Sequence, residues 1–273
     1  MNAKQLSGGS WMPLVGFGTW PMVGEEAREA VGFAIEAGYR SIDTSEQYGN
    51  EEAVGAAVRD SQVPRADLFV TTKFNTKWHG EHLVAEALDA SLHRLGLEYV
   101  DLLLIHWPNP WEGRFAEAWR GMLRLREERR VRAIGVSNFL PKHIHELLVA
   151  TGAAPEVNQI ELDPTLPRTE WRAYHRRRDI HTVGWSPLGR GGELLRHPVV
   201  LELAEQHGKS PAQVVLRWQI EVGAGFVARS TNRERIVQNL DLFDFTLGEE
   251  GMRRLAVLDE DREPARDPET HGH

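Results

Sequence analysis

The stretch Ser41–Glu52, S-I-D-T-S-E-Q-Y-G-N-E-E, decides how the rest of the chain is interpreted. An amphipathic helical pattern at Glu25–Ala37 and a short apolar run come before it, so it begins as a strand and opens into a loop. In that loop Asp43 and Tyr48 stand five residues apart, close enough for both side chains to face one pocket. The stretch therefore predicts a polar site at the end of a strand.

Two later apolar runs also end in polar side chains. Residues 68–72 lead into Lys73, and residues 101–105 lead into His106. If these strands lie parallel and side by side, the amine and the imidazole converge with Asp43 on one rim. An acid, a phenol, an amine and an imidazole on one rim make a proton-transfer site.

Apolar runs alternate with helical patterns along the whole chain, which predicts a parallel sheet. No G-x-G-x-x-G follows the first run, so a closed (β/α)₈ TIM barrel is favoured over an open doubly wound sheet. We expect a single α/β domain over 1–273, with a short N-terminal hairpin within 1–13, an extra C-terminal helix at 249–258 and a polar tail after it. The expected strands are Val15–Thr19, Tyr39–Ile42, Leu68–Thr72, Leu102–Ile105, Val131–Val136, Glu156–Ile160, Ile180–Trp185 and Gly225–Ala228.

Composition narrows the function. The 273 residues carry a formal charge of −8, which argues against nucleic acid or an anionic membrane as the main partner. There is no cysteine, and no apolar run approaches the roughly 20 residues that cross a bilayer. The N-terminus has no apolar segment typical of a secretory signal, so a cytoplasmic protein is expected. His143 and His145 point to different faces of a predicted helix, and no metal site is expected.

The four rim residues have complementary chemistry. A tyrosine hydroxyl has an unperturbed pKa of about 10, which a nearby ammonium lowers. Lys73 is the obvious cation for Tyr48, and Asp43 is the anion that would let Lys73 be buried. A neutral His106 can donate a hydrogen bond to a carbonyl oxygen. Each residue alone has an ordinary structural explanation, but together they predict the protonation of an oxygen that becomes an alkoxide.

No side chain can deliver a hydride, which points to a nicotinamide cofactor. Amides at two later strand ends could hold its carboxamide, and an indole could stack on its ring. Arginines beside a later helix N-terminus suit phosphate binding, and an extra 2′-phosphate would favour NADPH, although a solvated arginine face is the alternative. The expected cofactor-binding residues are Ser137, Asn138, Gln159, Trp185, Ser186, Leu188, Gly189, Arg229, Ser230, Thr231, Asn232, Arg235 and Asn239. Trp20, Trp107 and Trp78 lie just past strand ends and would line a substrate pocket or merely cap the barrel.

At these residues the sequence resembles the aldo-keto reductase family over nearly its whole length, and its short C-terminus is similar to the prokaryotic, diketogluconate-reductase-like branch. The resemblance implies a (β/α)₈ barrel, NADPH-linked carbonyl reduction, a catalytic tetrad of Asp43, Tyr48, Lys73 and His106, and a monomer. The matching segments are G-F-G-T-W (16–20), D-T-S-E-Q-Y-G-N-E (43–51), T-T-K (71–73), L-L-I-H-W-P (103–108), A-I-G-V-S-N-F (133–139), N-Q-I-E (158–161), S-P-L-G (186–189), S-P-A-Q-V-V-L-R-W (210–218) and R-S-T-N-R-E-R-I-V-Q-N-L (229–240).

The chain also departs from the family pattern. Trp185 stands where the family usually has a tyrosine, and Ala228-Arg229 replaces the usual Pro-Lys. The loop 74–79 loses the family's common Leu-Trp-Asn order, and the tail after Leu258 lacks an aromatic residue often found there. These differences concern the substrate and the choice between NADPH and NADH rather than the chemistry.

Two classes of function follow. The first is an NADPH-dependent reductase of aldehydes or ketones, in which Tyr48 protonates the oxygen. The second is a nucleotide-binding regulatory or sensor protein that keeps the cofactor bed but turns over little. Sugar ketoacids, dicarbonyls and aromatic aldehydes all remain open as substrates.

Overall fold

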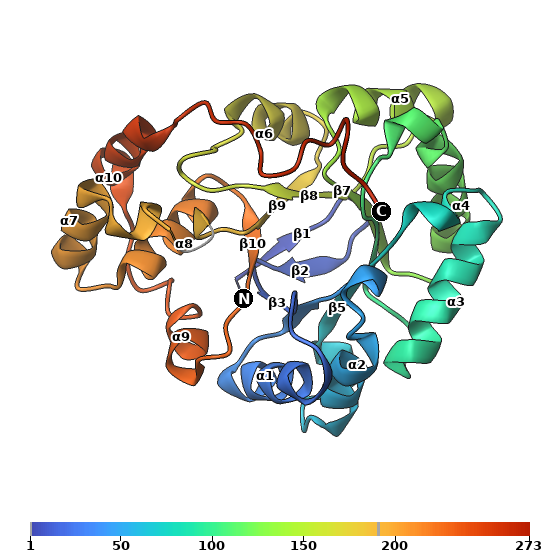
Figure 1. Ribbon diagram of the computed structural model, residues 1–273, viewed down its shortest axis with the longest axis horizontal. Helices are drawn as coiled ribbons and strands as arrows, with labels where there is room; N and C mark the ends of the chain where they lie inside the picture. Colours follow the sequence, from blue (N-terminus) through green and yellow to red (C-terminus); the bar gives the residue numbers. More distant parts are fainter. Residues whose placement is uncertain (1, 190–191) are drawn as a thin grey trace.

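The computed structural model describes residues 2–189 and 192–273. Within them, eight parallel strands close into a barrel in the order β10-β3-β4-β5-β6-β7-β8-β9 (Figure 1). The predicted barrel is confirmed. Its strands are β3 (Val15–Gly18), β4 (Ser41–Asp43), β5 (Phe69–Phe74), β6 (Leu102–Ile105), β7 (Ala133–Ser137), β8 (Val157–Glu161), β9 (His181–Trp185) and β10 (Gly225–Ala228).

Helices surround the barrel and follow its strands along the chain (Figure 1). α7 was not expected from the sequence; with α8 it packs a second apolar cluster that the extra helix α10 joins. The helices are α1 (Gly24–Ala37), α2 (Glu51–Asp60), α3 (Leu83–Leu95), α4 (Phe115–Glu127), α5 (Pro141–Thr151), α6 (Thr169–Arg176), α7 (Pro198–His207), α8 (Pro211–Glu221), α9 (Arg233–Gln238) and α10 (Gly248–Leu255).

Strand alternation decides which side chains enter the barrel. In β5, Val70 and Phe74 pack outward against the helices, whereas Phe69 joins the apolar cluster inside the barrel. Because successive side chains of a strand point to opposite faces, Lys73 has the inward parity of Phe69. In β6, Leu102 belongs to the apolar cluster inside the barrel, and by the same alternation His106, just beyond the end of the strand, points inward as well. The inward positions at the carboxyl ends of the strands are therefore the polar ones.

The N-terminal hairpin closes the opposite end of the barrel. It consists of β1 (Ala3–Gln5) and β2 (Trp11–Pro13), which pair antiparallel, as expected. Leu6 and Met12 join the apolar cluster inside the barrel, and the Gly8 amide donates to the Glu156 carboxylate, 2.9 Å away, at the start of β8. One end of the barrel is thus closed by apolar packing.

Across the described residues, no helix combines the length and apolarity that crossing a membrane requires.

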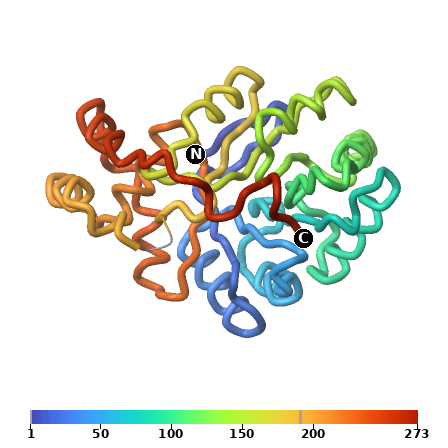
Figure 2. The backbone as a smooth tube through the Cα atoms, turned by 45° about the horizontal axis from the view of Figure 1, so that its top comes forward, coloured from blue at the N-terminus to red at the C-terminus, as the bar shows by residue number. Residues whose placement is uncertain are grey.

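The segment after α10 crosses the other end of the barrel. Figure 2 shows it in dark red, running over the strands toward the early loops of the chain. Arg262 anchors its beginning by pairing with Glu161 and Asp163, at and just past the end of β8. The predicted polar tail therefore packs across the carboxyl end of the barrel.

Candidate active site

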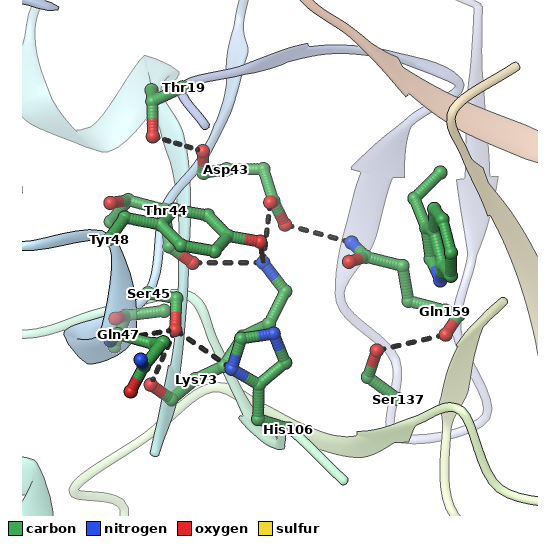
Figure 3. A network of polar contacts seen from close by, with 12 residues as sticks. Thr19, Asp43, Thr44, Ser45, Gln47, Tyr48, Lys73, His106, Ser137 and Gln159 are labelled. Atoms are coloured by element: carbon green, nitrogen blue, oxygen red, sulfur yellow. Dashed lines mark hydrogen bonds and ion pairs between the residues drawn. The ribbon is translucent and has the colours of Figure 1, made fainter. Parts of the chain in front are cut away.

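Four polar side chains meet at the carboxyl end of the barrel (Figure 3). Asp43 ends β4, Lys73 lies in β5 and His106 follows β6 directly. Tyr48 is the last residue of a 3₁₀ turn, Glu46–Tyr48, that begins just past β4. The convergence expected from the sequence is the arrangement that the structure shows.

The Lys73 ammonium is the centre of this cluster. Its Nζ lies 2.5 Å from Asp43 Oδ1, 2.9 Å from the Thr44 carbonyl oxygen and 3.4 Å from the Tyr48 hydroxyl. Each of the three ammonium hydrogens therefore has an acceptor. The second carboxylate oxygen of Asp43 accepts from Gln159 Nε2 at 2.8 Å, so the carboxylate is held by two donors.

The Lys73–Asp43 ion pair is buried. Lys73 is fully buried and only 3% of Asp43 is exposed. Burial alone lowers the pKa of Lys73, but its interactions with the Asp43 carboxylate and with Tyr48 outweigh this effect, and the net pKa is raised. Lys73 therefore stays an ammonium at neutral pH, and removing either partner would leave a buried charge unpaired.

The pKa of Tyr48 differs from the sequence expectation. Burial raises the pKa of its hydroxyl, and this effect outweighs the lowering by Lys73. The charge of Asp43 also raises the pKa. Lys73 acts in the expected direction, but the net shift is upward because the phenolate loses hydration. The Tyr48 hydroxyl consequently keeps its proton at neutral pH, as a general acid must before it reacts.

His106 lies beside the phenol as a neutral ring. Its ring meets Tyr48 edge to face, with centroids 5.7 Å apart. Burial lowers the pKa of His106 well below 6.5, and the charge of Lys73 lowers it further. Nδ1 lies 3.0 Å from the Ser45 hydroxyl, and the ring's other nitrogen, Nε2, is turned toward Tyr48 and Lys73 (Figure 3).

The expected carboxamide-binding residues form one hydrogen-bonded group. Trp185 Nε1 donates to Asn138 Oδ1 at 2.9 Å, and Asn138 Nδ2 donates to the Ser137 hydroxyl at 3.0 Å. The Ser137 hydroxyl in turn donates to the Gln159 carbonyl oxygen at 2.9 Å. Asn138 adopts a left-handed backbone (φ 64°), which turns the chain sharply after β7. The group reaches the Lys73 cluster through Gln159, whose side chain donates to Asp43.

The remaining expected cofactor residues lie on two loops. Ser186, Leu188 and Gly189 follow β9, and Gly189 has a positive φ of 59°. The second loop, 229–232, joins β10 to α9. Two further expected residues follow it: Arg235 lies on α9, and Asn239 comes directly after it.

Local hydrogen bonds shape the second loop. The Asn232 side chain caps α9 by accepting from the Arg235 amide at 3.0 Å, and the Ser230 hydroxyl accepts from the Asn232 amide at 3.1 Å. Arg229 and Arg235 are exposed, and neither guanidinium forms an ion pair with a carboxylate of the described residues. Thr231 is exposed, whereas Asn239 is buried.

The three tryptophans expected near the substrate have different surroundings. Trp107 is buried beside His106, and His271 of the tail packs against it with ring centroids 4.6 Å apart. The Trp78 indole donates to the Glu46 carboxylate at 3.0 Å, whereas Trp20 is 57% exposed. Of these three tryptophans, Trp107 is the one whose ring stacks beside His106 of the polar cluster.

The sequence did not reveal every residue of this site. Ser45 lies inside the deciding stretch, but nothing in its pattern shows that its hydroxyl reaches His106. The Gln159–Asp43 contact joins residues 116 positions apart, and only barrel closure brings them together. His271 and His273 lie in a tail without periodicity, which carries no signal of their place.

Known proteins are similar to this chain over most of its length. The Aldo/keto reductase family profile matches residues 9–260. An aldo-keto reductase of Mycolicibacterium smegmatis is 45% identical over 97% of this chain and 96% of its own. The methylglyoxal reductase DkgA of Escherichia coli is 40% identical over 98% of this chain and 97% of its own.

Solved structures agree. An aldo-keto reductase of Bombyx mori, determined in complex with NADP, superposes with a TM-score of 0.88 at 36% identity and covers 96% of this chain and 94% of its own. The match spans nearly the whole length of each relative, and it includes the strands that carry the cluster. The chain therefore belongs to the aldo/keto reductase family and is an NADP-dependent oxidoreductase.

Proposed function

We propose that the protein reduces aldehydes or ketones to alcohols with NADPH and that Tyr48 donates the proton. The observation that carries the proposal is the buried cluster in which Lys73 Nζ contacts both Asp43 and the Tyr48 hydroxyl, with His106 at its edge. A protonated phenol beside a fixed ammonium suits the protonation of a developing alkoxide.

Each side chain then has one task. A carbonyl oxygen placed between Tyr48 and His106 would accept hydrogen bonds from the hydroxyl and from the imidazole N–H. As negative charge develops on this oxygen, the Tyr48 proton transfers to it. Lys73 stabilises the resulting phenolate, and Asp43 keeps the buried Lys73 charged. This general acid step is expected to contribute roughly 10²–10⁴-fold.

The residues present fit a nicotinamide dinucleotide phosphate. Gln159 gives its amide N–H to Asp43, and no described residue donates to its Oε1, which leaves an acceptor for a carboxamide. Ser137 and Asn138 provide polar groups beside it, and Trp185 provides an aromatic face. Arg229 and Arg235, which pair with no carboxylate of the described residues, suit a phosphate. When bound, the reduced nicotinamide supplies the hydride.

Further expected contacts have weaker structural support. Ser186, Leu188 and Gly189 would border the cofactor after β9, and Ser230, Thr231, Asn232 and Asn239 would border its phosphate and adenine end. For the substrate, Trp107 has the strongest position because it adjoins His106. Trp20 and Trp78 would form the outer wall. The cluster comes from one chain, which is compatible with a working monomer.

Turnover is the test. NADPH oxidation is followed by absorbance with aldehydes, keto-sugars and dicarbonyls, and methylglyoxal is included because a relative carries that name. We expect Tyr48→Phe to abolish turnover and to leave NADPH binding intact. Tyr99→Phe is the matched control, since that hydroxyl donates to the Arg65 carbonyl oxygen, 3.4 Å away, and its removal should leave turnover unchanged.

The outcomes separate the two classes of function. Turnover in the wild-type protein that Tyr48→Phe removes supports the reductase. Tight NADPH binding without turnover on any carbonyl would favour the nucleotide sensor instead. Retained turnover in Tyr48→Phe would show that another group supplies the proton.

A further inference from the structure

The tail places a second imidazole on the catalytic one. His273 Nε2 lies 3.2 Å from His106 Nδ1, and the two rings meet edge to face with centroids 4.7 Å apart. The His273 carbonyl oxygen accepts from the Thr76 amide at 2.9 Å. His273 therefore contacts the side of His106 that Ser45 also contacts, opposite the nitrogen turned toward Tyr48 (Figure 3).

Several contacts outside this pair hold the tail in place. Glu269 pairs with Lys142 and lies 2.7 Å from His143 Nε2 on α5. Gly272 packs so closely on the buried Asn109 side chain that an added Cβ would lie 2.2 Å from its nearest atom. The position of the His273 ring is thus built by packing over several residues rather than by one surface contact.

Both rings of the pair are neutral at pH 7. Burial lowers the pKa of His273 to about 4, and the nearby His271 and Arg266 lower it as well. The pKa of His106 is also well below 6.5. Each ring then carries one N–H, and one nitrogen of the contact donates while the other accepts.

The neighbouring hydroxyl favours one of the two arrangements. The Ser45 oxygen accepts from the Gln47 amide at 3.2 Å, and its single hydrogen can go to His106 Nδ1, 3.0 Å away, or to the Lys73 carbonyl oxygen, 3.3 Å away. If Nδ1 is the bare nitrogen, its lone pair faces the His273 N–H and the Ser45 hydroxyl, and Ser45 donates by the shorter of its two contacts. If Nδ1 carries the hydrogen, that N–H is shared by two acceptors, and the Ser45 hydrogen is left with the longer contact to the Lys73 carbonyl oxygen.

We propose that His273 is a positioning residue for the carbonyl reduction: it donates its Nε2–H to His106 Nδ1 and so keeps the His106 proton on Nε2. There the N–H can donate to the carbonyl oxygen beside Tyr48, which only this tautomer can do. The proposal rests on the proposed function, because it assumes that His106 binds the carbonyl.

Ring ¹⁵N spectra of histidine-labelled protein test it. The nitrogen shifts report which ring nitrogen carries the hydrogen, and a His106→Gln spectrum identifies the His106 signals. We expect the Nε2–H tautomer in the wild-type protein and a shift toward Nδ1–H in His273→Ala. The carbonyl kcat should fall about 2- to 12-fold, the range for one neutral hydrogen bond, with NADPH affinity unchanged.

Two further variants separate positioning from packing. His273→Gln carries an amide N–H at a similar reach, so it should restore both the tautomer and kcat. Thr270→Ala changes an exposed residue whose hydroxyl donates to Asp267, and it should match the wild-type protein.

An Nδ1–H tautomer in the wild-type protein, or unchanged tautomer shares in His273→Ala, would overturn the proposal. Equal loss in His273→Ala and His273→Gln would do the same. The spectra need no turnover. A wild-type protein that reduces no carbonyl would therefore refute the proposed function without affecting the tautomer result.

Discussion

Asp43→Asn is the sharpest test of the buried cluster, because it keeps the shape of the side chain and removes only its charge. Both neighbours of the carboxylate are donors: Lys73 Nζ at 2.5 Å and Gln159 Nε2 at 2.8 Å. The asparagine amide has one oxygen, which can take the place of only one carboxylate oxygen and accept from Lys73 or from Gln159. Its NH₂ group then faces the other donor. The substitution thus leaves buried donors unpaired as well as an uncompensated ammonium.

The size of the effect follows from these contacts. Removing one partner of a buried ion pair costs about 3–5 kcal/mol. At roughly 2–4 °C per kcal/mol for a chain of this size, the melting temperature should fall by about 6–20 °C. Without Asp43, burial lowers the pKa of Lys73 and favours its neutral form. Lys73 and the Tyr48 oxygen are 3.4 Å apart, an interaction of about 5 kcal/mol at an effective dielectric constant of 20, so loss of the ammonium charge should lower kcat by about 100-fold or more.

The assay is thermal unfolding across pH beside steady-state turnover. The pKa of Lys73 is raised in the folded state, so its stabilising contribution is fully present below its ordinary value of 10.5 and is lost as the pH rises through the raised value. The deficit of Asp43→Asn should therefore persist from neutral pH to about 10 and shrink above it. Asp89→Asn makes the same change in an exposed pair with Arg130 and should cost less than about 1 kcal/mol. Equal stability losses at Asp43 and Asp89 would refute the reasoning.

Three further outcomes are expected. Because burial lowers the pKa of His106 well below 6.5, kcat should show no acidic limb near that pH, and a limb at 6–7 in the pH–rate profile would contradict a neutral imidazole. Arg229→Ala should weaken NADPH binding about 10- to 150-fold, the range for hydrogen bonds to charged groups, and should change NADH binding little. Arg233→Ala is the control, because that guanidinium lies over the ring of Phe33 on α1, and it should weaken neither. Fluorescence titration with each cofactor distinguishes the two variants. Trp185→Phe removes the indole N–H that Asn138 accepts at 2.9 Å, so NADPH affinity should fall about 2- to 12-fold with kcat nearly unchanged, and a loss confined to kcat would argue against a binding role.

The local sequence pattern was enough to predict the barrel and the polar side chains at its rim. Apolar runs such as Leu102–Ile105 can be buried on both faces only in a sheet covered by helices, and alternation with helical patterns makes that sheet parallel. Side-chain parity along each strand then places Asp43, Lys73 and His106 on the inside. These features depend on residues close in sequence, and a pattern that repeats every two residues is readable without coordinates.

The sequence by itself determined the residue types at the strand ends and hence the proton chemistry. Only the tertiary structure decided what depends on burial and on distant contacts. The net pKa of Tyr48 is raised because burial in the folded chain removes hydration from its phenolate, an effect that no local pattern reports. Gln159 reaches Asp43, and His273 reaches His106, only once the barrel has closed and the tail has packed across it. Hydration and long-range contacts are properties of the folded chain, which is why the tuning of this site had to await the structure.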